Sequence, residues 1–220
     1  MNNIKEKKYI LFDLDGTITD SMEGITKSVQ YALSKFEINV DNLNELCKFI
    51  GPPLKDSFMK YYNFSEKEAE RAIEFYREYF EKNGIYENLV YDNIEEIFKS
   101  LKEQGKYLLI ATTKPTFFAE KILAYFNLSH YFELVSGSNM DGTREKKDEV
   151  IEFALKEKNI TDYSKVIMIG DREHDVIGAK KLGIESIGVL YGYGDYNELS
   201  SSGADYIVKD VQELKELLCK

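Results

Sequence analysis

The sequence of 220 residues predicts an α/β fold in which helices cover both faces of a mainly parallel sheet and a block of helices is inserted into the chain. Three observations support this prediction. Short apolar, β-rich runs alternate with helical patterns from Asp92 onward, as is typical of parallel sheets. A further run of this kind, Lys8–Phe12, comes early in the chain. Between them, from Ser21 to about Asn88, the apolar spacing is helical.

The first expected strand, Lys8–Phe12, ends in a pair of carboxylates. Its apolar residues are typical of a buried strand, and the segment Asp-Leu-Asp-Gly-Thr follows at residues 13–17. Open α/β sheets bind ligands at the carboxyl ends of their strands. Two acids there can divide two tasks, with Asp13 as nucleophile and Asp15 as the group that moves protons. For an isolated pair of this spacing, helix capping is the simpler interpretation.

The inserted block contains helical patterns separated by a break. One apolar helical face is formed by Ile25, Val29, Ala32, Leu33 and Phe36, and another by Leu43, Leu46, Phe49 and Ile50. Ser65 and Glu68 have the spacing of a capping box that opens a long helix. Gly51, Pro52 and Pro53 cannot continue a helix. The expected domains are therefore a core of residues 1–20 and 89–220 and a helical cap of residues 21–88.

After the insert, strands and helices are expected to alternate. The expected strands are Tyr107–Ala111, Phe132–Val135, Lys165–Ile169, Ser186–Leu190 and Tyr206–Val208. Expected helices start at Asp92, near Phe118, at Asp148 and at Asp210, and a further one ends at Leu182. Gly105 lies where a helix C-terminal cap is expected.

Composition limits the classes of partner. With 29 basic and 39 acidic residues the net charge is −10, which argues against nucleic acid or an anionic membrane as the main partner. No segment has the apolar length of a membrane span. The two cysteines, Cys47 and Cys219, lack metal-ligand spacing and favour a reducing compartment. We therefore expect a cytoplasmic protein, and the oligomeric state stays open.

Polar residues follow several of the expected strands. Thr112, Thr113 and Lys114 come after residues 107–111, where hydroxyl and amide groups suit a phosphate oxygen. Asp171 and Asp175 follow the strand at residues 165–169. Carboxylates of this kind suit Mg²⁺, which prefers carboxylate oxygens, waters and a substrate phosphate.

A group of cations lies ahead of the helix expected at Asp148. Arg144, Lys146 and Lys147 stand where positive charge opposes the helix macrodipole. Because these charges are unfavourable for the helix itself, they indicate that an anion binds nearby.

Four segments occur along the chain in the order Asp13–Thr17, Thr112, Lys147 and Gly170–Asp175. Together they resemble the motifs of the haloacid dehalogenase superfamily of phosphohydrolases. The resemblance covers essentially the whole chain and implies a Rossmann-like core with an α-helical cap. It implies that Asp13 attacks phosphorus while Asp15 serves as general acid and then general base. Thr112 and Lys147 would hold phosphate oxygens, with Lys147 preferred to Lys146. Mg²⁺ would be held by Asp13, the Asp15 backbone carbonyl and Asp171, with support from Asp175.

In finer detail, four stretches resemble the phosphoglycolate phosphatase and 5′-nucleotidase-like branch: Ile18–Ser21, Ala111–Pro115, Asp141–Arg144 and Ile169–Asp175. The implied function is hydrolysis of a small phosphorylated metabolite, phosphoglycolate or a nucleoside monophosphate. Gly51 and Pro52 of the cap, together with Lys114 and Arg144, are expected near the substrate. Two alternatives stay open: a phosphomutase of the same superfamily, and a non-catalytic module that senses phosphate or Mg²⁺.

Two features have competing interpretations. His174 is a possible general base, but a polar residue that shapes the acidic loop is the favoured interpretation. Gly192-Tyr193-Gly194 follows a strand and suggests a dinucleotide fingerprint, yet Asn197 occupies the position of the third glycine.

Overall fold

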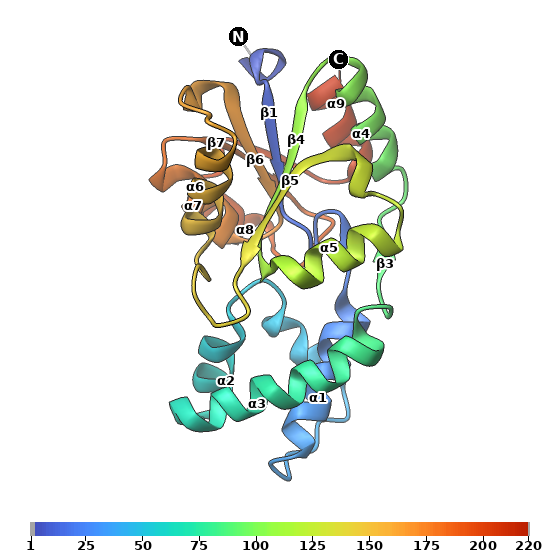
Figure 1. The fold of residues 1–220 in the computed structure, drawn as a ribbon, viewed down its shortest axis with the longest axis vertical. Helices are drawn as coiled ribbons and strands as arrows, with labels where there is room; N and C mark the ends of the chain where they lie inside the picture. Colours follow the sequence, from blue (N-terminus) through green and yellow to red (C-terminus); the bar gives the residue numbers. More distant parts are fainter. Residues whose placement is uncertain (1–2, 220) are drawn as a thin grey trace. The chain divides into compact units, whose positions relative to one another are not determined.

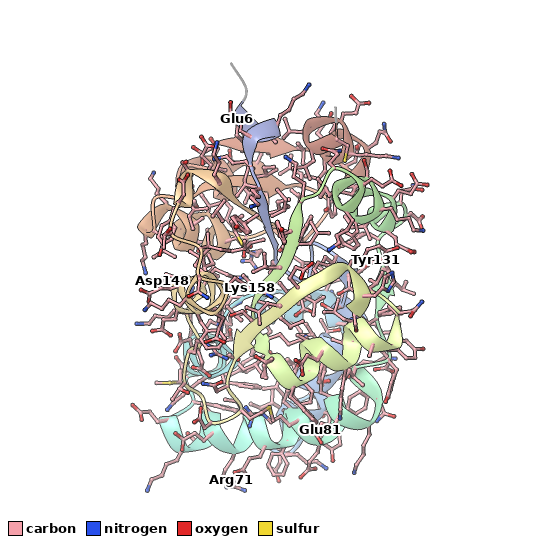
Figure 2. The ribbon with its side chains drawn as sticks, turned by 45° about the horizontal axis from the view of Figure 1, so that its top comes forward. Glu6, Arg71, Glu81, Tyr131, Asp148 and Lys158 are labelled. Atoms are coloured by element: carbon pink, nitrogen blue, oxygen red, sulfur yellow. The ribbon has the colours of Figure 1, made fainter. Side chains whose placement is uncertain are left out.

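The computed structural model describes residues 3–219, and its internal contacts divide the chain into two compact units (Figure 1). One unit comprises Met1–Thr19 and Val90–Lys220, and the other comprises Asp20–Leu89. Among the described residues, no helix is both long enough and apolar enough to cross a lipid bilayer. Charged side chains such as Arg71, Glu81 and Lys158 lie at the surface (Figure 2).

The first unit is built on a six-stranded parallel sheet, which confirms the predicted α/β fold class. Its strand order is β5-β4-β1-β6-β7-β8. The strands are β1 (Tyr9–Phe12), β4 (Tyr107–Pro115), β5 (Phe132–Ser138), β6 (Val166–Gly170), β7 (Glu185–Val189) and β8 (Tyr206–Val208). The helices of this unit are α4 (Ile94–Glu103), α5 (Thr116–Tyr125), α6 (Lys147–Glu157), α7 (Glu173–Lys181), α8 (Tyr196–Ser202) and α9 (Val211–Cys219).

Strand β1 lies near the middle of this sheet and is buried on both faces. Leu11 packs with residues of α6 and α7 in one apolar cluster, whereas Phe12 makes an edge-to-face contact with Phe98 of α4. Successive side chains of a strand point to opposite faces. The continuous apolar run of β1 is therefore explained by helices on both sides of the sheet.

The register of β1 brings three strand ends together. Phe12 pairs with Ile110 of β4 on one side and with Ile169 of β6 on the other. The ends of β1 and β6 and the last part of β4, from Ala111 to Pro115, therefore lie toward the same edge of the sheet. The Asp13 N–H donates a hydrogen bond to the Ile169 carbonyl at 2.9 Å, which extends the pairing by one residue.

The second unit is helical. It contains α1 (Met22–Ser34), a 3₁₀ segment (Leu43–Phe49), α2 (Leu54–Tyr62), α3 (Glu66–Tyr79) and a π-helical turn (Phe80–Gly84). The capping box predicted for α3 is present, because Ser65 N–H donates to Glu68 Oε2 and Glu68 N–H donates to Ser65 Oγ. Gly24 of α1 packs so closely on the π-helical turn that a Cβ there would overlap the Gly84 carbonyl. Two short strands, β2 (Thr19–Asp20) and β3 (Leu89–Val90), pair where the chain passes between the units.

Four details differ from the expected elements. Strand β4 continues beyond Ala111 to Pro115, with an irregular register against β5. Helix α4 begins at Ile94 and not at Asp92, because Asn93 adopts a left-handed conformation with φ of 65°. The segment Leu43–Phe49 is a 3₁₀ helix. Helix α8 was not expected, and it is capped by the Asp195 side chain.

The packing around β1 predicts a large effect of truncating Leu11. Its side chain is 0% exposed, so Leu11→Ala should lower the free energy of unfolding by about 2–5 kcal/mol through lost burial and a cavity. Leu89→Ala, at a side chain that is 70% exposed, is the matched control and should change it by less than about 0.5 kcal/mol. Urea unfolding monitored by circular dichroism measures both. Equal losses in the two variants would contradict this description of the core.

Candidate active site

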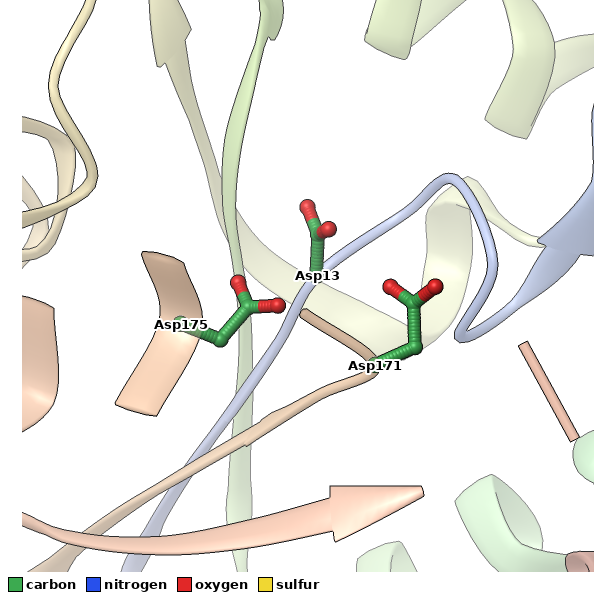
Figure 3. Close-up of side chains that lie close together, drawn as sticks. All are labelled: Asp13, Asp171 and Asp175. Carbon is green, nitrogen blue, oxygen red and sulfur yellow. The ribbon is translucent and has the colours of Figure 1, made fainter. Parts of the chain in front are cut away.

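Three carboxylates gather at the carboxyl edge of the sheet. Asp13 follows β1, Asp171 follows β6, and Asp175 lies in the first turn of α7. One oxygen from each lies within 4.8 Å of the others, and all three side chains are buried. Figure 3 shows the three side chains close together on these different segments.

Lys147, the first residue of α6, lies within this group. Its buried Nζ is 2.8 Å from Asp13 Oδ1 and 2.7 Å from Asp175 Oδ1, and it donates to the Ala111 carbonyl at 3.1 Å. Burial lowers the pKa of the Lys147 ammonium, but the charges of Asp13 and Asp175 outweigh this effect and hold the pKa above its usual value. Lys147 is therefore a permanent cation of the site.

The carboxylates remain crowded in spite of this cation. Burial raises the pKa of Asp13 to about 6, with repulsion from Asp175 adding to burial and Lys147 opposing it. Burial, followed by repulsion from Asp175 and Asp13, raises the pKa of Asp171 well above its usual value. Ionisation of Asp13 and Asp171 is therefore less favourable in this site than in water, and a further positive charge would stabilise the ionised forms.

The donor atoms fit a hard divalent cation. Asp171 Oδ1 is buried and has no hydrogen-bond partner among the described residues. Its second oxygen accepts from the Tyr193 N–H at 2.7 Å, and Asp175 Oδ2 accepts from the Arg172 N–H at 3.1 Å. Carboxylate oxygens held in this way are the ligands that Mg²⁺ takes, and backbone donors fix their orientation.

Two glycines allow the segments to approach. Gly16 has a φ of +81°, and a Cβ there would overlap the Asp171 carboxylate. A Cβ on Gly170 would overlap the Asp175 side chain in the same way. Glycine is needed at residue 16 for both its conformation and its lack of a side chain. The glycine that follows Asp15 is therefore required for the Asp171 carboxylate to pack against this segment.

The residues expected to bind phosphate lie on the last part of β4. Thr112 is buried, and its Oγ1 accepts from the Lys114 N–H at 3.2 Å. Thr113 is half-buried beside it. The Lys114 side chain is directed to Asp15, with its Nζ 3.0 Å from Oδ1 and 2.8 Å from Oδ2. The Asp15 carboxylate is therefore paired separately from the three-carboxylate group.

The other predicted residues lie on other segments of the chain. Lys146 is exposed, so Lys147 is the lysine that reaches the carboxylates. The Arg144 guanidinium stacks on Phe153 and donates to the Gly137 carbonyl, which holds the loop between β5 and α6. Gly51 and Pro52 belong to the second unit, ahead of α2. His174 is half-buried, and burial lowers its pKa.

Sequence reasoning missed a loop that supports the site. Residues 190–195 follow β7, and besides the Tyr193 amide they contribute the Tyr191 hydroxyl, which donates to the Thr17 carbonyl at 3.0 Å. Glu198 of α8 accepts from Arg172 Nε at 2.7 Å and from the Glu173 N–H at 2.8 Å. The sequence signal for this loop is the Gly-Tyr-Gly segment at the end of a strand, a pattern that also resembles part of a nucleotide-binding fingerprint.

Curated relatives match the chain over most of its length. It is 43% identical to a 5'-nucleotidase of Pseudomonas aeruginosa over 209 residues, which are 95% of this chain and 94% of the relative. It is 33% identical to the tyrosine-protein kinase PtkA of Mycobacterium tuberculosis, over 95% of this chain and 72% of that protein. A phosphoglycolate phosphatase of Colwellia psychrerythraea is 26% identical, with 96% of each chain covered.

Solved structures agree with these relatives. A predicted phosphatase from Clostridium acetobutylicum superposes with a TM-score of 0.93 at 54% identity and covers 96% of this chain and 97% of its own. A putative phosphatase from Clostridium difficile gives a TM-score of 0.86 at 55% identity, with 96% and 98% covered. The model of the haloacid dehalogenase-like hydrolase family matches residues 10–189. The chain therefore belongs to the haloacid dehalogenase-like hydrolase family and is one of its phosphatases.

Proposed function

We propose that this chain is a Mg²⁺-dependent hydrolase of small phosphomonoesters that works through an aspartyl-phosphate intermediate. The observation that carries the proposal is the position of Asp13, which stands at the carboxyl end of β1 within a buried group of carboxylates. Lys147 contacts it at 2.8 Å. A nucleophilic carboxylate, a cation and a set of metal-ligand oxygens are thereby brought together, as covalent phosphoryl transfer requires.

The balance of charge supports a divalent cation. Asp13, Asp171 and Asp175 are buried with Asp15, and the ammonium groups of Lys147 and Lys114 compensate two of these four carboxylates. When all four are ionised, two negative charges remain, equal to the charge of one Mg²⁺. Asp13, Asp171 and Asp175 would hold the ion, together with the Asp15 backbone carbonyl. Bound there, it would screen the nucleophile from the phosphate and draw charge from the phosphate oxygens.

The protein groups then have distinct tasks. Asp13 attacks phosphorus, and the bond to the leaving oxygen breaks as Asp15, which has taken up a proton from solvent, gives that proton to the oxygen. Asp15 next takes a proton from water, which attacks phosphorus and releases Asp13 and inorganic phosphate. Thr112 and Thr113 would hold phosphate oxygens. Lys147 has three N–H donors and three acceptors in the structure, so it would exchange one, such as the Ala111 carbonyl, to reach the phosphate.

The helical unit, residues 20–89, would act as the cap that selects the substrate. All phosphomonoesters share the phosphate, so discrimination must come from contacts to the leaving group. The names of the relatives, 5'-nucleotidase and phosphoglycolate phosphatase, support two substrate classes: nucleoside monophosphates and small acid phosphates. We propose that Gly51 and Pro52, in the segment ahead of α2, contribute to this choice.

The role of Asp13 predicts that Asp13→Asn abolishes turnover while the fold persists. An amide cannot form the acyl phosphate, so hydrolysis should fall below about 1% of the wild-type rate. Because burial and repulsion raise the pKa of Asp13 to about 6, its charged form at neutral pH costs more free energy in the folded protein than in the unfolded chain. The Asn variant should thus unfold at a temperature no lower than the wild type in EDTA. Hydrolysis retained at more than about 1% would remove Asp13 from this role.

The metal proposal predicts a response to Mg²⁺ that can be measured without substrate. Mg²⁺ should raise the wild-type unfolding temperature, because a ligand that binds only the folded state stabilises it. Asp171→Asn should lose this increase, and Asp92→Asn, at an exposed carboxylate, should retain it. EDTA should abolish hydrolysis, and Ca²⁺ should inhibit because its larger, looser coordination misplaces the nucleophile. Full activity in chelator would contradict the proposal.

The cap proposal predicts a change of preference in Pro52→Ala and Leu54→Ala. Each should alter the ratio of kcat/KM for phosphoglycolate and a nucleoside 5′-monophosphate by at least about 10-fold, equivalent to about 1.4 kcal/mol of leaving-group contacts. Hydrolysis of a small aryl phosphate should change less. If the segment only breaks a helix, all activities should fall together with the unfolding temperature, and an unchanged ratio would show that it does not select the substrate.

A further inference from the structure

Asp15 and Lys114 form a buried ion pair beside the three-carboxylate group. The Lys114 Nζ lies 3.0 Å from Asp15 Oδ1 and 2.8 Å from Oδ2. The two side chains are only 6% and 9% exposed, so water screens the pair little. Both oxygens of the carboxylate are thus contacted by one ammonium, which restricts the rotation of the carboxylate as well as its position.

Each of the two acids that follow β1 has its own lysine. Asp13 is paired with Lys147 from α6, whereas Asp15 is paired with Lys114 from the end of β4. Lys147 also contacts Asp175. The nucleophile and the residue assigned to proton transfer therefore have different cationic partners, although they are only two positions apart in the sequence.

The backbone on both sides of the Asp15–Lys114 pair is held in place. The Lys114 N–H donates to Thr112 Oγ1, and a Cβ on Gly137 of β5 would overlap the Lys114 carbonyl. On the other side, the backbone of Asp15 forms an isolated β-bridge with Thr19, and the Gly16 N–H donates to the Thr19 carbonyl at 2.7 Å. The ammonium and the carboxylate therefore meet from two fixed segments.

We propose that Lys114 is a positioning residue for the Asp15 carboxylate and does not serve the substrate directly. This inference rests on the proposed function, in which Asp15 transfers the proton. Each carboxylate oxygen accepts at two lone-pair positions, so one contact from Lys114 leaves a position free for the proton. Held in this way, Asp15 can give a proton to the leaving oxygen and then take one from water without a change of rotamer.

The two roles make different predictions for different leaving groups. An alkoxide needs a proton as the phosphorus–oxygen bond breaks, but the 4-nitrophenolate of an aryl ester leaves without one. Formation of the aspartyl phosphate should therefore depend on Asp15 for an alkyl ester and hardly at all for the aryl ester. Hydrolysis of the aspartyl phosphate should depend on Asp15 for both, because water must lose a proton in that step.

The test compares Lys114→Met, Lys114→Arg and wild type in first-turnover experiments with 4-nitrophenyl phosphate and phosphoglycolate, in the presence of Mg²⁺. In Lys114→Met the first turnover of phosphoglycolate should slow about 100-fold, the scale of misplaced acid catalysis. The 4-nitrophenol burst should slow by less than about 3-fold, a change too small for lost acid catalysis. Acid-quenched protein should then carry accumulated phosphoenzyme from the aryl ester. Lys114→Arg should recover part of the loss, because it keeps the cation.

Two controls separate positioning from stability and from phosphate binding. Lys121→Met removes an exposed lysine of α5 and should change neither ester. The ratio of the two first-turnover rates comes from one protein sample, so it does not depend on the fraction that is folded. In an Asp15→Asn background, adding Lys114→Met should slow the first turnover of phosphoglycolate by less than about 2-fold, since residues that act as one unit are not additive.

Equal slowing of the two esters, or full additivity with Asp15→Asn, would overturn the positioning role and favour direct phosphate binding. The failure of the proposed function itself would look different. In that case the wild-type protein would form no phosphoenzyme from either ester, whatever occupies position 114.

Discussion

The buried ammonium of Lys147 contacts two of the carboxylates at 2.8 and 2.7 Å, and the arrangement of the acidic group depends on it. It connects the segment after β1 to the first turn of α7, although Asp13 and Asp175 are far apart in the sequence. Without it, the two carboxylates would repel each other in a buried place where such repulsion is strong. Gly178 of α7 leaves room for it, because a Cβ there would press on the Lys147 side chain. The packing of α7 and the chemistry of the site therefore depend on the same lysine side chain.

The arrangement of the buried carboxylates lowers the stability of the folded protein when no metal is bound. The raised pKa values of Asp13 and Asp171 mean that their charged forms are less favourable here than in water. The Tyr193 N–H holds the Asp171 carboxylate, and the Arg172 N–H holds the Asp175 carboxylate, in orientations that suit a metal ion. Charges that are fixed before the reaction need no rearrangement when the transition state forms. Loss of stability at a functional site is a common consequence of such preorganisation.

The sequence allowed the main elements and the acidic residues to be predicted, because each has a local signal. The apolar run before Asp13 and the strand before Asp171 both place a carboxylate at a strand end. The pairing of Lys114 with Asp15 has no such signal, since it depends on a strand that continues past Ala111 with irregular register. The Tyr193 contact uses a backbone amide, which any residue but proline carries. The start of α4 was misplaced because Asn93 takes a left-handed conformation.

The central position of β1 also affects how the chain folds. Its partners β4 and β6 lie after the whole helical insert, so no sheet edge carrying the carboxylates exists until distant parts of the chain have met. Closing a loop costs entropy that grows only with the logarithm of its length. An insert between β1 and β4 can therefore become longer or shorter at little thermodynamic cost to the sheet. Contacts of such long range slow folding, so variation in the insert is expected to appear in the rate of assembly before it appears in the stability of the core.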